Sequence, residues 1–216
     1  MNTSKPSSAP ASVPRPRDLS KLDEVTLSAA SQRFLAMARA TAGGTPTWRA
    51  RKGVEAFDLL ALAQESGRYR IDGLDLRHDL RALVTMRVPV PCLPDPAGPL
   101  QFAPFARLGL SYEEQFLKWP TAGTAFAQLL SPLHAWLPNL GRPIQVLCLG
   151  TTLPAGIRVR EILHMVFGAL TLQTVQMDLL DSAGVLNPEA ALWWQRNLDK
   201  VPITREGFVC EQGGMP

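Results

Sequence analysis

Several features that mark familiar classes of protein are missing from this sequence. Its three cysteines are too few and too unevenly spaced for a disulfide framework, and their odd count favours a reducing compartment. With three histidines and neither a Cys-x-x-Cys nor a His-Glu-x-x-His motif, the sequence predicts no metal site, and we expect no cofactor. No apolar stretch approaches the roughly 18 residues that cross a bilayer, and no apolar segment follows the basic N-terminus. We therefore expect a cytoplasmic protein that binds no membrane.

The charge of the chain gives no support for a nucleic-acid partner. The formal net charge is +3 at pH 7, with no long run of Lys or Arg and no alternation of aromatic with basic residues. We therefore expect no binding to nucleic acid. What the chain does have is apolar residues, which make up 46% of its 216 positions. That is enough to bury a sizeable core within one domain.

Composition divides the chain into three parts. Residues 1–17 are mostly Ser, Pro, Ala and Arg, with little to bury, and are predicted to be a disordered tail. Residues 18–209 are predicted to form a single domain. Residues 210–216, which include Cys210 and two adjacent glycines, are predicted to be a frayed end.

Helical spacing of apolar residues predicts a first helix from Leu19 to Ala42. Either Asp18 or Ser20 could cap its start, and Gly43-Gly44 follow its end. Alternating apolar residues then predict a hairpin over residues 57–72, with its turn at 64–67.

The clearest strand pattern covers residues 80–90, where apolar and polar residues alternate. The prolines from Pro89 to Pro99 are expected to end this strand in an irregular loop, and we interpret Cys92, which lies among them, as structural or incidental. Residues 102–110 could form a further strand. Residues 131–142 contain several breakers and are expected to be irregular, and long structureless segments within a domain are often functional.

The last third of the chain begins with an apolar run, Ile144–Gly150, that carries Cys148. Strong amphipathic spacing then predicts a helix from Val159 to Leu170, with His164 on its solvated face. A further helix is predicted from Pro188 to about Asp199, because Asn187 is a good N-cap and proline suits the first helical position. Its adjacent tryptophans, Trp193 and Trp194, cannot both face inward, so one is expected in the core and one at the surface. Strands followed by helices indicate an α+β fold with an antiparallel sheet covered by helices.

The residues around Cys148 resemble those of ubiquitin-conjugating enzymes. In that family His-Pro-Asn precedes the catalytic cysteine by less than a dozen residues, and Leu-x-Pro-Glu-x-Ala begins a later helix. Here Leu137-Pro138-Asn139 precedes Cys148, and the segment from Leu186 to Ala191 follows the amphipathic helix. The resemblance spans roughly residues 80–200. It implies the family's fold, with an N-terminal helix, a meander of about four antiparallel strands, and C-terminal helices packed on the sheet.

The chain also departs from that family. Leu137 stands where the family has histidine, and His134 lies three residues earlier. The tryptophan and proline usual shortly after the cysteine are absent, apart from Pro154. In this divergence the chain resembles bacterial conjugating-enzyme-like proteins, which are encoded in antiviral defence operons beside an activating-enzyme-like protein and a ubiquitin-like protein.

The resemblance implies a thiol enzyme. Cys148 would accept the C-terminus of a ubiquitin-like protein as a thioester from an activating-enzyme-like protein, then pass it to an amine on a target protein. Asn139 would donate a hydrogen bond to the oxyanion of the tetrahedral intermediate. Asp178 and Asp181 would help to position or deprotonate the incoming lysine.

Each of these residues also has a purely structural interpretation. Cys148 could be a small buried hydrophobe in a conjugating-enzyme-like fold that serves only as a binding or scaffold module. Asn139 could be a turn residue after a proline, and Asp178 and Asp181 could be solvated loop carboxylates. A third class of function, a subunit that caps a partner through one of the two tryptophans, would show as an exposed aromatic patch.

Overall fold

The computed structural model describes residues 25–95, 97–117, 126–150, 153–180, 184–202 and 208–209. It has the predicted α+β composition, with helices at both ends of the element order and strands between them. The elements are α1 (Ala29–Ala40), α2 (Pro46–Glu65), β1 (Tyr69–Asp75), β2 (Leu80–Cys92), β3 (Gln101–Tyr112), the 3-10 helix η2 (Glu114–Leu117), β4 (Ala127–Ser131), β5 (Leu140–Gly141), β6 (Val146–Leu147), α3 (Val159–Leu170), α4 (Pro188–Gln195) and the 3-10 helix η3 (Leu198–Lys200).

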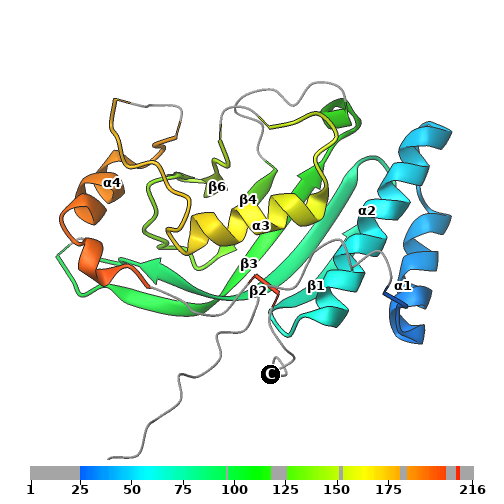
Figure 1. Ribbon diagram of the computed structural model, residues 1–216, viewed down its shortest axis with the longest axis horizontal. Coiled ribbons are helices and arrows are strands. Elements are labelled where there is room, and N and C mark those ends of the chain that lie inside the picture. Colours follow the sequence, from blue (N-terminus) through cyan, green and yellow to red (C-terminus); the bar gives the residue numbers. More distant parts are fainter. Residues whose placement is uncertain are drawn as a thin grey trace, which may run out of the picture.

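The strands form one antiparallel sheet in the order β1-β2-β3-β4-β6-β5. The first four strands form an antiparallel meander, as predicted in outline, but its strands are not all the predicted ones: β4 was not predicted as a strand. The short β5–β6 pair extends this meander. In β2 the buried side chains alternate with more exposed ones from Leu80 onward, which confirms the pattern seen in the sequence. Helix α3 lies across one face of the sheet, with α1 and α2 at one end of the molecule and α4 at the other (Figure 1).

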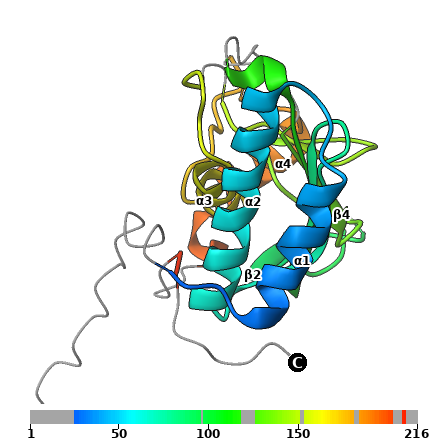
Figure 2. The ribbon, with the colours of Figure 1, turned by 90° about the vertical axis from the view of Figure 1, so that its right-hand side faces the viewer.

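The predicted hairpin over residues 57–72 is wrong in its first half, because residues 57–63 belong to helix α2. The Thr45 side chain accepts a hydrogen bond from the Trp48 amide, and Pro46 occupies the first turn. Helix α2 is buried over much of its circumference, so apolar residues follow one another there without a one-sided helical period. Figure 2 shows α1 and α2 packed side by side, and the chain thus has two N-terminal helices where one was predicted.

The first helix begins later than predicted. Helix α1 starts at Ala29, and the Ser28 side chain caps it by accepting a hydrogen bond from the Ser31 amide. The residues from Val25 to Ser28 are not helical, so the predicted start at Leu19 is wrong. The two proposed caps, Asp18 and Ser20, lie outside the described residues.

Strand β2 does not stop at its prolines but continues to Cys92. A register shift between Arg87 and Val90 accommodates Pro89, which has no amide hydrogen to donate to the ladder. Pro91 then pairs with Phe102 of β3. Cys92 itself is buried, and burial raises the pKa of its thiol, which agrees with a structural role. The apolar run Ile144–Gly150 forms less strand than its composition suggests, because only Val146 and Leu147 join the ladder.

The helices of the last third follow their predictions closely. Helix α3 spans the predicted residues, and α4 begins at Pro188 with the Asn187 side chain accepting from the Ala190 amide. Helix α4 ends at Gln195, earlier than predicted. Trp194 is buried and its Nε1 donates to the Trp136 carbonyl over 2.7 Å, while Trp193 is half-buried, as expected for such a pair. None of the helices in the described part of the chain is long and apolar enough to cross a membrane.

Candidate active site

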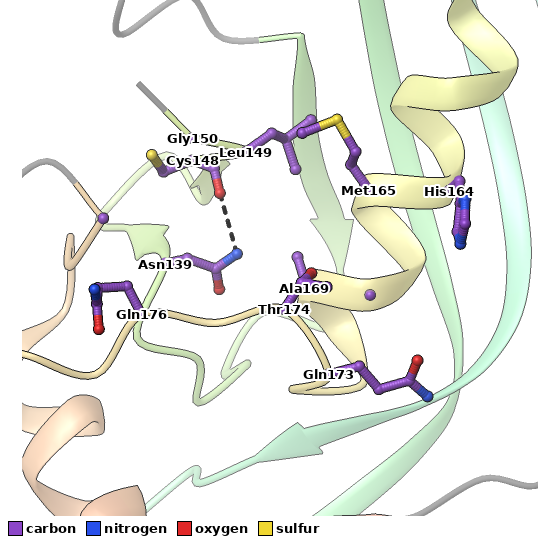
Figure 3. A pocket seen from close by; sticks show the side chains of 12 residues that line it. Asn139, Cys148, Leu149, Gly150, His164, Met165, Ala169, Gln173, Thr174 and Gln176 are labelled. Carbon is purple, nitrogen blue, oxygen red and sulfur yellow. Dashed lines mark hydrogen bonds between the residues drawn. The ribbon is translucent and has the colours of Figure 1, made fainter. Parts of the chain in front are cut away.

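Cys148 and Asn139 are brought together by the β5–β6 pair. Asn139 directly precedes β5 and Cys148 directly follows β6, so the antiparallel pairing of Leu140 with Leu147 sets them opposite each other. The Cys148 amide donates to the Asn139 carbonyl over 2.9 Å. In return, Asn139 Nδ2 donates to the Cys148 carbonyl over 3.2 Å, the dashed line in Figure 3. Two hydrogen bonds thus fix the main chain of Cys148 from the Asn139 side.

The start of α4 joins the same cluster. The Pro138 carbonyl accepts hydrogen bonds from the amides of Leu186, at 2.9 Å, and Asn187, at 2.8 Å. Backbone hydrogen bonds therefore connect Pro138-Asn139 both to Cys148 and to the start of α4, which lies much further along the sequence.

A cavity of about 320 Å³ adjoins Cys148 and Asn139. Its volume is near the lower end of the range for small-ligand pockets. Much of its wall is apolar or small because α3 presents its C-terminal half there. The lining includes Leu149, Gly150, Met165, Gly168, Ala169 and Thr174.

Asn139 is buried, with 3% of its surface exposed, yet one of its polar atoms is left over. Its Nδ2 binds the Cys148 carbonyl, but its Oδ1 has no hydrogen-bond partner. An unsatisfied buried acceptor is costly, and such atoms are rare in native structures. The amide that positions Cys148 therefore also carries a buried acceptor without a hydrogen-bond partner.

The Cys148 side chain is half-buried, in contrast to the fully buried Cys92. Figure 3 shows its sulfur pointing away from the Asn139 amide and away from α3, so it is the main-chain carbonyl of Cys148 that faces Asn139. A partly exposed thiol on a fixed main chain can meet a reactive group presented by another protein.

Of the two predicted acidic helpers, Asp178 is not part of this cluster. Asp178 is exposed and outside the cavity lining, and its Oδ1 accepts a hydrogen bond from the Leu180 amide within its own loop. Asp181 lies outside the described residues. In the described part of the chain, no group of three His, Cys, Asp or Glu side chains is placed to hold a metal ion.

Neither candidate histidine lies against Cys148. His164 is exposed on α3, as predicted, and borders the far side of the cavity, where its ring packs on Phe208 at 4.7 Å between centroids. His134 is exposed, and its carbonyl accepts a hydrogen bond from the Leu93 amide.

Sequence reasoning missed the turn that closes the cavity after α3. Gly168 lies inside the helix, and its carbonyl accepts from the amides of Gln173 and Thr174 as the chain folds back. A Cβ at Gly168 would lie 2.6 Å from Thr174 Oγ1, so only glycine fits there unstrained. A glycine inside an otherwise strong helical pattern was the available signal, because it costs helix stability unless packing requires it.

No known protein family, curated protein or solved structure matches this chain. The resemblance to conjugating enzymes therefore rests on the sequence motifs around Cys148 alone.

Proposed function

We propose that this chain is a cysteine-dependent acyl transferase for a ubiquitin-like protein. It accepts the partner's C-terminus as a thioester on Cys148 from an activating-enzyme-like protein and passes it to an amine on a target. The observation that supports this most is the convergence of Pro138-Asn139, Cys148 and Leu186-Asn187 through backbone hydrogen bonds. These are the same segments that resemble the conjugating-enzyme motifs in the sequence.

The proposed chemistry is an exchange between thiols followed by attack of an amine. The Cys148 thiolate attacks the carbonyl of the incoming thioester, and the thiol of the activating protein leaves. This step exchanges one thioester for another and proceeds without a general base beside the cysteine. A target amine then attacks the new thioester, Cys148 leaves as a thiolate, and the amine nitrogen loses its proton to form the amide.

Asn139 has two parts in this proposal. Its first is to hold the main chain of Cys148 through the two hydrogen bonds between them. Its second is to stabilise the oxyanion with the amide hydrogen that the Cys148 carbonyl does not use, since a side-chain amide carries two donors. The participation of Asp178 and Asp181 in positioning the lysine stays a prediction.

The bacterial defence setting is also part of the proposal, and it rests on the resemblance alone. On this proposal an activating-enzyme-like protein and a ubiquitin-like protein are encoded beside this chain, and these are the two proteins to use in a test.

The decisive experiment is to incubate the chain with ATP and those two proteins, quench without reductant and measure the intact mass. We expect an adduct of the ubiquitin-like protein that added thiol removes. Cys148→Ser should give a thiol-resistant ester or no adduct, whereas the matched control Cys92→Ser should keep the labile adduct. Absence of an adduct while the activating protein is itself charged, and while both partners still bind, would leave a non-catalytic binding module.

A further inference from the structure

The cavity beside Cys148 is walled by separate parts of the fold and is large enough for a small organic molecule. Asn139 precedes β5, Cys148 and Leu149 follow β6, and Met165 and Ala169 belong to the C-terminal half of α3. The volume is about 320 Å³. Since an apolar cavity of about 150 Å³ already holds benzene, a ring with a polar substituent fits here.

The described lining of this cavity carries no Asp, Glu, Lys or Arg. The titratable side chains within that described lining are the Cys148 thiol and the His164 imidazole, and His164 lies at the far side, against Phe208. A charged ligand would leave water for a wall that offers it no counter-charge, which costs a large amount of free energy. The lining therefore favours an uncharged molecule.

The wall that faces Asn139 is apolar or small. Leu149 and Met165 contribute apolar side chains, and Gly168 and Ala169 leave space between α3 and the segment that carries Cys148. Methionine adapts to ligands of different shape because its side chain is unbranched and flexible. Walls of this kind bind the apolar body of a ligand, while a few polar atoms set its orientation.

Asn139 supplies a polar atom that needs a partner. The residue is 3% exposed, its Nδ2 donates to the Cys148 carbonyl, and its Oδ1 accepts no hydrogen bond. Figure 3 shows the side chain extending from the start of β5 toward Ala169 and Thr174. A buried acceptor that has lost its hydrogen bonds to water is stabilised by any donor that reaches it.

We propose that this cavity is a binding site for a small uncharged molecule that has an apolar body and an N–H or O–H donor. The apolar body lies against α3, and the donor group binds Asn139 Oδ1. Carboxamides, alcohols and phenols have this chemistry. The inference stands apart from the proposed function, because binding is measured on the chain alone, without ATP or partner proteins.

Three probes of nearly the same shape test the two requirements separately. Benzamide is uncharged and has an N–H donor, acetophenone has a methyl group in place of the amide nitrogen, and benzoate is an anion without a donor. We expect benzamide to bind the full chain with a dissociation constant on the order of 1 mM, as suits a fragment of its size. Acetophenone should bind about tenfold more weakly because it cannot donate to the buried acceptor, and benzoate should not bind. Titrations followed by saturation-transfer NMR measure all three.

Substitution of the α3 wall tests whether binding occurs in this cavity. Ala169→Leu fills the space from α3 and should abolish binding of benzamide. The matched control Ala36→Leu adds the same side chain at an exposed position on α1 and should bind as the wild type does. If Ala169→Leu does not fold by circular dichroism, Met165→Trp takes its place. A wild-type chain that does not bind benzamide up to its solubility limit, or binding that survives the filled cavity, would overturn the inference.

Asn139→Leu tests the hydrogen bond, since it removes the acceptor and keeps the size of the side chain. Loss of the contact between Nδ2 and Cys148 affects both uncharged probes alike, so the ratio of their dissociation constants is the readout. We expect this ratio to fall from about ten to near one. A ratio that stays at about ten would exclude Asn139 as the acceptor. Equal affinities of the wild type for benzamide and acetophenone would exclude the donor, and equal affinities for benzamide and benzoate would exclude selection against charge.

Discussion

Asn139 makes contacts with Cys148 through both its main chain and its side chain. Its carbonyl and its Nδ2 bind the amide and the carbonyl of Cys148, and its Oδ1 remains a buried acceptor without a partner. A side chain used only to form a turn would not need to reach across to the residue that carries the thiol. We therefore place Asn139 as the residue that positions Cys148.

Replacing Asn139 separates its two proposed parts. Asn139→Ala removes one hydrogen bond and the unsatisfied acceptor together, so we expect a loss of about 1 kcal/mol in the free energy of unfolding. If Asn139 also stabilises the oxyanion, discharge of the thioester to free lysine should slow about a hundredfold. Chemical denaturation and single-turnover discharge measure the two effects.

The matched control for Asn139→Ala is Gln128→Ala. It also removes a side-chain amide that donates to a main-chain carbonyl, but Gln128 is exposed and lies outside the cavity lining. We expect this variant to discharge its thioester at the wild-type rate. Discharge at the wild-type rate by Asn139→Ala as well would restrict Asn139 to positioning.

Gly168 offers a second test at a single position. Gly168→Ala would gain about 1 kcal/mol of helix propensity, but its new methyl group would stand 2.6 Å from Thr174 Oγ1. Overpacking of this kind costs about 1–3 kcal/mol, so we expect a net loss of stability in urea denaturation.

The control for that substitution is Thr174→Ala in the same background. It removes the Oγ1 that the new methyl group would strike, so the double variant should recover most of the loss. A Gly168→Ala variant that is more stable than the wild type would show that the turn after α3 moves aside without cost.

At the scale of elements, a group of buried charges joins α2 to α3. Glu55 is buried, and its Oε2 accepts a hydrogen bond from the Val159 amide, at the N-terminus of α3, over 2.7 Å. Its Oε1 lies 2.7 Å from Arg51 Nε and 3.1 Å from Arg158 Nε, and Arg158 also pairs with Asp58. The carboxylate is well placed because the start of a helix presents unpaired amides and the positive end of its dipole.

Glu55→Ala should therefore be strongly destabilising. It leaves two partly buried arginines and the Val159 amide without this carboxylate, and breaking a buried ion pair costs about 3–5 kcal/mol. The comparison is Glu161→Ala, because the Glu161 side chain is exposed and accepts a hydrogen bond from the Arg158 amide over 2.9 Å. Loss of that cap should cost about 1 kcal/mol. Equal midpoints for the two variants in urea would show that the buried group stabilises the fold no more than the exposed cap does.

The elements with a one-sided pattern were predictable, and those buried on several sides were not. Helix α3 could be read from its apolar spacing, and the start of α4 from Asn187 and Pro188. Helix α2 could not be predicted from apolar spacing, because Lys52 and Glu55 are buried in it along with its apolar residues. The start of α2 could nevertheless have been predicted, since Thr45 is a suitable N-cap and Pro46 follows it at the first helical position.

At the scale of the whole molecule, the candidate site depends on contacts that no local pattern contains. Pro138, Cys148 and Leu186 are brought together by the β5–β6 hairpin and by the start of α4, and only the resemblance to a known family indicated that they belong together. The cavity was not predictable at all. It depends on the turn that Gly168 permits and on the direction of the chain after α3.

The Pro138 carbonyl accepts hydrogen bonds from the amides of Leu186 and Asn187. These two bonds join the start of α4 to the segment that holds Cys148 in place. A displacement of the start of α4 would therefore shift Pro138 and, through the neighbouring Asn139, the main chain of Cys148.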